Sequence, residues 1–175
     1  MKESLRLAQA RLDRGSPSIN WVRPEAMHLT LKFLGEVDER LIDALGNGLE
    51  NAASGTGPFN LTVEGVGAFP NQRRPRVIWA GIGASAELTE LKERIEQSIN
   101  ALGFEPEERE FSPHLTLCRI KTPEDSMLMG SVLSEENPPL KTEFTVSSVV
   151  LFKSVLRPKG AEYTAMREAF LQARQ

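Results

Sequence analysis

Several chemically active residue types are scarce in this chain of 175 residues. A single cysteine, Cys118, excludes an internal disulfide and a cage of thiolate ligands around a metal. No apolar run approaches the roughly 20 residues of a membrane span, and the N-terminal residues lack the apolar stretch of a signal peptide. We therefore expect a cytoplasmic protein without a membrane partner, whose chemistry does not use a thiol.

A strong excess of charge of one sign is also missing. The net charge of -3 argues against a protein that coats nucleic acid nonspecifically, because that mode relies on a broad basic surface. Positive charge is concentrated only at Arg73, Arg74 and Arg76, where guanidinium groups could hold an anion locally or simply face solvent in a loop. Hydrophobic residues make up 40% of the chain, enough for a core, and we expect residues 1–175 to form a single domain.

Hydrophobic periodicity predicts an α+β chain with mixed or antiparallel sheets. Helices are expected over residues 3–14, 38–55, 86–102 and 124–133. Strands are expected over residues 19–22, 28–34, 59–64, 77–82, 114–117 and 144–153. Both segments that begin with histidine are followed by helical stretches, so a duplicated half is plausible.

The two histidines of the chain stand in the same four-residue word, His-Leu-Thr-Leu, beginning at His28 and again at His114. At average residue usage, a second histidine would repeat the following three residues with odds on the order of one in a thousand. Histidine is the side chain best suited to exchange protons near neutral pH, so the pair is a candidate acid and base. The alternative is that each histidine is a hydrogen-bonded residue beside core leucines.

Strand geometry makes the repeated word suitable for a phosphate site. Side chains two apart share a face, so His28 lies with Thr30, and His114 with Thr116, while the leucines enter the core. Two imidazoles and two hydroxyls can hold a phosphate and move protons on opposite sides of it. Two histidines are too few for zinc without distant ligands, and Cys118 is too far along the strand to bond His114 directly.

The wider sequence resembles the two-histidine (2H) phosphoesterases, and among them the LigT-like RNA 2′,3′-cyclic phosphodiesterases, also called 2′-5′ RNA ligases. The resemblance rests on both His-x-Thr-x words and on residues 21–24, 28–35, 67–70, 74–79 and 151–156. It implies a bilobal α+β fold with two pseudo-symmetric lobes of mostly antiparallel sheet, outer helices and a central cleft. Each lobe is expected to give one His-x-Thr strand to that cleft.

The resemblance also implies a reaction and a role for each residue. The activity would be hydrolysis of a 2′,3′-cyclic phosphate on an RNA end or small nucleotide to a 2′-phosphate, without metal or another cofactor. His28 would be the general acid for the departing 3′ oxygen and His114 the base for water. Thr30 and Thr116 would hold nonbridging phosphate oxygens.

Three further residues are weaker candidates for substrate binding. Arg119 matches a phosphate-contacting position of the family, but strict alternation puts it on the leucine face, so this role requires a bulge or the end of the strand. Phe33 could stack on a base, although the same parity favours a core aromatic. Arg76, with its neighbours in the basic loop, is expected to contact the RNA backbone.

One departure from the family is expected to matter for the first lobe. Relatives usually open with a short apolar strand before the first helix, whereas Met1 here begins directly in that helix. A missing strand would expose a sheet edge near the lobe that carries His28.

Two alternative functions stay open: a module that binds RNA or nucleotides without cleaving them, and 2′-5′ ligation at the same site. No obligate protein partner is inferred.

Overall fold

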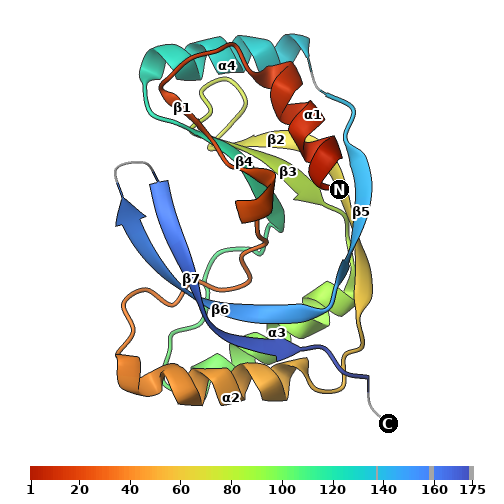
Figure 1. Ribbon diagram of the computed structural model, residues 1–175, viewed down its shortest axis with the longest axis vertical. Coiled ribbons are helices and arrows are strands. Elements are labelled where there is room, and N and C mark those ends of the chain that lie inside the picture. The colour runs from red at the N-terminus through yellow and green to blue at the C-terminus, as the bar shows by residue number, and fades with distance from the viewer. Residues whose placement is uncertain (137, 158–159, 174–175) are drawn as a thin grey trace. The chain divides into compact units, whose positions relative to one another are not determined.

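A computed structural model describes residues 1–136, 138–157 and 160–173 (Figure 1). The elements follow the order α1 (Lys2–Leu12), β1 (Ile19–Trp21), a 3-10 turn (Pro24–Ala26), a second 3-10 turn (Glu39–Leu41), α2 (Ile42–Ala53), β2 (Phe59–Phe69), β3 (Val77–Ile82), α3 (Ala86–Asn100), β4 (His114–Ile120), α4 (Pro123–Glu135), β5 (Lys141–Val146), β6 (Ser148–Arg157) and β7 (Gly160–Phe170). None of the helices in the described ranges is long and apolar enough to cross a membrane.

The chain divides into two compact units. Unit 1 comprises Met1–Thr30, Leu61–Gly83 and Ser112–Phe144, and unit 2 comprises Leu31–Asn60, Ala84–Phe111 and Thr145–Gln175. The α+β class and the antiparallel strand pairing expected from the sequence are confirmed.

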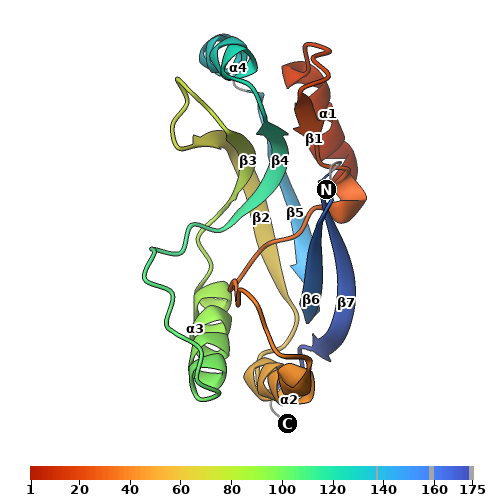
Figure 2. The same cartoon turned by 90° about the vertical axis from the view of Figure 1, so that its left-hand side faces the viewer.

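Unit 1 is built around a sheet whose strand order is β1-β4-β3-β2-β5 (Figure 2). Alternate residues of its strands enter one hydrophobic core, in which Val63, Ile78 and Leu117 are almost completely buried. Helices α1 and α4 cover this face of the sheet and contribute Leu5 and Met129 to the same core. The other face of the central strands carries His114 and Thr116 of β4.

Unit 2 consists of helices α2 and α3 and the two-stranded sheet β6-β7. The spacing that predicts α3 buries Leu88, Leu91, Ile95 and Ile99 along one side of the helix. Its N-terminus is capped by the Ser85 hydroxyl, which accepts a hydrogen bond from the Leu88 N–H at 3.2 Å. Helix α2 packs against both α3 and β7.

Three predicted elements differ from the structure. The segment 28–34 is not a strand: only Leu29 forms an isolated bridge. The strand expected over 144–153 is divided at Ser147, because β5 joins the larger sheet while β6 pairs with β7. Strand β7 has no counterpart among the predicted elements, since its Ala, Glu, Met and Arg residues are helix formers and pairing with β6 overrides that preference.

Candidate active site

Residues 28–30 of the first word and the whole second word belong to unit 1, where Leu29 forms an antiparallel bridge with Leu115. Leu115 is 2% exposed, and Leu29 packs against the same hydrophobic core. Leu29 and Leu115 therefore anchor both words to the core of unit 1. The resemblance implied instead that each lobe would supply one word.

The bridge also sets the register of the four polar side chains. One residue to either side, His28 stands opposite Thr116, and Thr30 stands opposite His114. Residues directly opposite one another share a face, so all four side chains belong to the face away from the leucines. The histidines are diagonal neighbours, whose Cα atoms in regular pairing lie about 7–8 Å apart. The two imidazoles therefore start from neighbouring positions on one face.

Each imidazole is held by a contact of the same kind, to the backbone carbonyl two residues earlier in the chain. Nδ1 of His28 lies 3.0 Å from the carbonyl oxygen of Ala26, and Nδ1 of His114 lies 2.6 Å from that of Ser112. A carbonyl oxygen can only accept, so each Nδ1 carries a proton and donates it. Nε2 is then the nitrogen of each ring that gains or loses a proton. The neutral ring is a base at Nε2, and the charged ring is an acid there.

Arg119 lies on the histidine face because β4 contains a bulge. Val77 pairs with Arg119 and Trp79 pairs with Thr116, so partners two residues apart on β3 are three residues apart on β4. The extra residue shifts the alternation of β4 by one position. Arg119 is exposed and shares its face with Thr116. The bulge that a phosphate contact by Arg119 requires is therefore present.

Two aromatic side chains on the same face contact His114. The Phe69 ring meets the imidazole edge to face, with centroids 5.0 Å apart and planes at 78°. The Trp79 ring lies 6.0 Å from the imidazole and 5.3 Å from Phe69. Neither residue has a role predicted from the sequence. The signal that could have found them is alternation along β2 and β3, which puts Phe69 beside Val77, and Trp79 beside Thr116.

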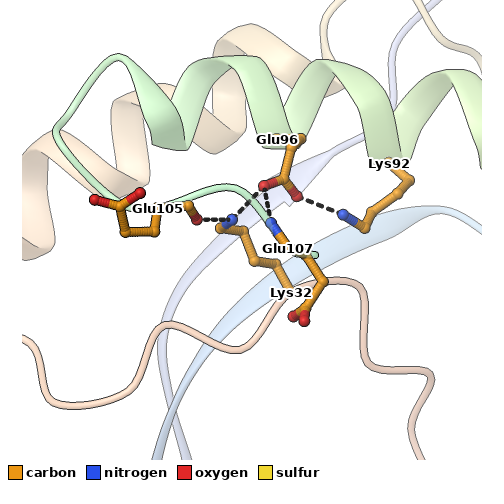
Figure 3. Close-up of polar contacts among 5 residues, drawn as sticks. All are labelled: Lys32, Lys92, Glu96, Glu105 and Glu107. Carbon is orange, nitrogen blue, oxygen red and sulfur yellow. Dashed lines mark hydrogen bonds and ion pairs between the residues drawn. The ribbon is translucent and has the colours of Figure 1, made fainter. Parts of the chain in front are cut away.

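The segment after the first word is anchored within unit 2 by Lys32 (Figure 3). Its ammonium group pairs with the Glu96 carboxylate and donates to the carbonyl oxygen of Glu105 at 2.8 Å. Glu96 also pairs with Lys92 and accepts the Glu107 N–H at 3.0 Å. The Lys32 side chain is 5% exposed, so an aliphatic stem and a charge are both buried at this point.

Phe33, the next residue, is 74% exposed. The expectation of a core aromatic is wrong because it assumed the alternation of a strand, and residues 31–35 do not form one. Phe33 belongs to unit 2, whereas both histidines belong to unit 1. An exposed ring is available to stack on a base.

Arg76 is exposed at the end of the loop between β2 and β3, and its backbone is fixed. Its N–H donates to the Phe69 carbonyl at 2.7 Å, and its own carbonyl accepts from the Ile120 N–H at 2.9 Å. Arg76 precedes Val77, and continued alternation directs its side chain away from the histidine face. Arg73 and Arg74 are exposed in the same loop. In the described residues no three His, Cys, Asp or Glu side chains are grouped so that they could hold a metal ion.

Comparison with known proteins identifies the family of this chain. The family model described as LigT-like phosphoesterase matches residues 1–79 and 82–163. Proteins named RNA 2′,3′-cyclic phosphodiesterase include one from Aeropyrum pernix, 36% identical over 84% of this chain and 83% of its own length. Another, from Methanothermobacter thermautotrophicus, is 31% identical over 95% of this chain and 90% of its own length.

Solved structures support the same fold. A crystal structure of a protein from Thermus thermophilus has a TM-score of 0.81 and 28% identity, covering 99% of this chain and 93% of that one. Crystalline LigT from E. coli, complexed with 3′-AMP, has a TM-score of 0.73 at 23% identity, covering 97% and 90% of the two chains. The chain belongs to the LigT-like phosphoesterase family.

Proposed function

We propose that this protein hydrolyses the 2′,3′-cyclic phosphodiester at an RNA end, or in a small cyclic nucleotide, to a 2′-phosphomonoester. The observation that carries the proposal is the register of the two words, which gives one face two imidazoles and two threonine hydroxyls. The names of the relatives from Aeropyrum pernix and Methanothermobacter thermautotrophicus point to the same reaction. We further propose that both units act as one bilobal domain in the cytoplasm, where the lone Cys118 suits a reducing environment.

The reaction divides the proton transfers between the histidines. His114 accepts a proton at Nε2 from water, whose oxygen forms the new bond to phosphorus. The bond from phosphorus to the 3′ oxygen breaks, and His28 gives that oxygen its Nε2 proton. The product carries a 2′-phosphate and a 3′-hydroxyl, and the two rings end in exchanged protonation states. The carbonyls of Ala26 and Ser112 hold Nδ1 of each ring during both transfers.

Neighbouring donors would stabilise the negative charge that develops on the nonbridging oxygens of the phosphate. Thr30 and Thr116 would donate to the nonbridging oxygens, a role supported by the register of the two words around the Leu29–Leu115 bridge. Arg119 adds a positive charge and a planar fork of donors on that face. Phe33 is the candidate to stack on the terminal base, and Arg76 is a candidate for a more distant backbone phosphate.

The test is incubation with an RNA oligonucleotide that ends in a 2′,3′-cyclic phosphate, in the presence of EDTA. We expect a 2′-phosphate product at an undiminished rate, because the proton transfers use imidazoles. His28→Ala and His114→Ala should each lose on the order of 10² to 10⁴ in rate. Turnover only after a divalent metal is restored would refute the mechanism, and a 3′-phosphate would reverse the leaving group. Tight binding without turnover would identify a binding module, and joining of two RNA ends would identify a ligase.

The role of Arg119 has its own test. Arg119→Ala should lower kcat/KM by roughly 10- to 100-fold, since a hydrogen bond to a charged group contributes about 1.5–3 kcal/mol. Arg119→Lys keeps the charge but loses the fork and should recover part of the loss. Arg11→Ala on α1 removes the same charge from an exposed position and serves as the matched control. Equal activity of Arg119→Ala and Arg11→Ala would remove Arg119 from the site.

A further inference from the structure

The proposed reaction gives no role to Phe69 and Trp79, the aromatic pair beside His114. Phe69 and Trp79 both contact the imidazole, and they contact each other at 5.3 Å between ring centroids. Neither belongs to the hydrophobic core under α1 and α4, because both lie on the opposite face of the sheet. The Trp79 Nε1 atom is buried and has no hydrogen-bond partner within the described part of the chain. The indole packs against Phe69 and His114.

A glycine makes room for the indole. Gly67 is paired with Trp79 across β2 and β3. A methyl group at Gly67 would overlap the indole atoms Cη2 and Cζ2 and approach Cζ3 to 2.8 Å. A methyl group at Gly81, the partner of His114, would come within 3.4 Å of the same Cζ3. The six-membered part of the indole thus lies on Gly67 and extends to the strand position next to His114.

We propose that Trp79, seated on Gly67, is a positioning residue that together with Phe69 fixes the ring plane of His114. This inference rests on the proposed function, in which His114 Nε2 takes a proton from water. The bond from Nδ1 to Ser112 fixes one atom of the ring, but histidine χ2 is a broad torsion and a single bond does not define the plane. The two rings packed against the imidazole restrict that freedom. A misplacement of about 1 Å can cost about 10²-fold in rate.

The test uses the overlap at Gly67. The methyl group of Gly67→Ala would overlap the indole and displace it. We therefore expect kcat to fall by roughly 10- to 100-fold, with a smaller change in KM. Trp79→Phe removes the indole atoms that a methyl group at Gly67 would meet, and it deletes no hydrogen bond among the described residues. Alone it should lower kcat only several-fold. The double variant should match Trp79→Phe and not the product of the two losses.

A second readout does not depend on turnover. The chain has two histidines, so a His28→Ala background leaves only the imidazole signals of His114 in an NMR spectrum. The rings of Phe69 and Trp79 should shift these signals, and Gly67→Ala should move them. The double variant of Gly67→Ala and Trp79→Phe should give the same signals as Trp79→Phe alone. Gly83→Ala is the matched control, because its methyl group meets its nearest neighbours at 3.3 Å or more and lies away from the indole.

The outcomes separate this inference from the proposed function. Unchanged kcat and unchanged His114 signals in folded Gly67→Ala would overturn the positioning role, and so would losses that multiply in the double variant. If the wild type hydrolyses no cyclic phosphate while the His114 signals respond as described, the proposed function falls and the fixed ring plane stands. If Gly67→Ala does not fold, Trp79→Ala replaces it: a kcat lower by roughly 10- to 100-fold is expected, and an unchanged kcat would overturn the positioning role.

Discussion

Replacing Glu96 with glutamine tests the ion network that anchors the segment after the first histidine word. The carboxylate is 18% exposed and pairs with Lys32 and Lys92, whose side chains are 5% and 12% exposed. It also accepts the Glu107 N–H (Figure 3). Glu96→Gln keeps the shape and removes the charge. Two largely buried ammonium groups are then left without their carboxylate, which is the costly way to disrupt such a network.

The magnitude follows from the pKa of Glu96. Burial by itself would raise this pKa, but the hydrogen bonds from Lys32, Lys92 and the Glu107 N–H outweigh burial and lower it from 4.5 to about 2. That difference corresponds to roughly 3 kcal/mol of stability at neutral pH. Because the pKa is lower in the folded state, the contribution is complete above pH 4.5 and is lost as the pH falls toward 2.

Urea unfolding between pH 7 and pH 2.5 measures this contribution. Glu96→Gln should be less stable than the wild type by roughly 3 kcal/mol at pH 7, and the difference should shrink steadily below pH 4.5. Glu93→Gln, at an exposed position of the same helix, is the control for losing a carboxylate from α3. A difference that stays constant across this range, or equal losses in both variants, would refute the network as a source of stability.

Two other predictions concern parts of the chain outside the site. In α2, Gly48→Ala should raise stability by about 0.5–1 kcal/mol in thermal or urea unfolding, since the new methyl group meets Ser98 only at 3.7 Å. Gly46→Ala should not gain as much, because its methyl group would come within 2.9 Å of the Arg167 side chain; equal gains would contradict this reading. Burial raises the pKa of the Cys118 thiol to about 12, so iodoacetamide at pH 8 should alkylate it only after unfolding, and rapid alkylation of the folded protein would show an accessible thiolate.

The sequence predicts well those elements whose side-chain period is unbroken. Strand β3 has its predicted bounds, and the apolar positions of α3 are those that the structure buries. The alternation of side chains along a strand predicts that each histidine shares a face with the threonine two residues later, because it depends only on that spacing. The pairing of the words through Leu29 and Leu115 adds the register, which spacing cannot supply.

The remaining features depend on contacts between residues far apart in the sequence. The bulge in β4 is visible only once β3 is paired with it, and Arg119 changes face as a result. Lys32 and Glu96 are 64 residues apart, and no local pattern links them. Trp79 meets His114 because β3 and β4 are neighbours. Strand β7 is likewise a product of pairing with β6, against its own helix propensity.

The central claim is that His28 acts as acid and His114 as base on one phosphate. The most direct measurement is the pH dependence of kcat/KM for a 2′,3′-cyclic RNA end, in the wild type and in each alanine variant at its reduced rate. The wild type should show a bell-shaped profile. His28→Ala should lose the alkaline limb, where the acid loses its proton, and His114→Ala should lose the acidic limb, where the base gains one. A flat wild-type profile, or loss of the opposite limbs, would contradict the assigned roles.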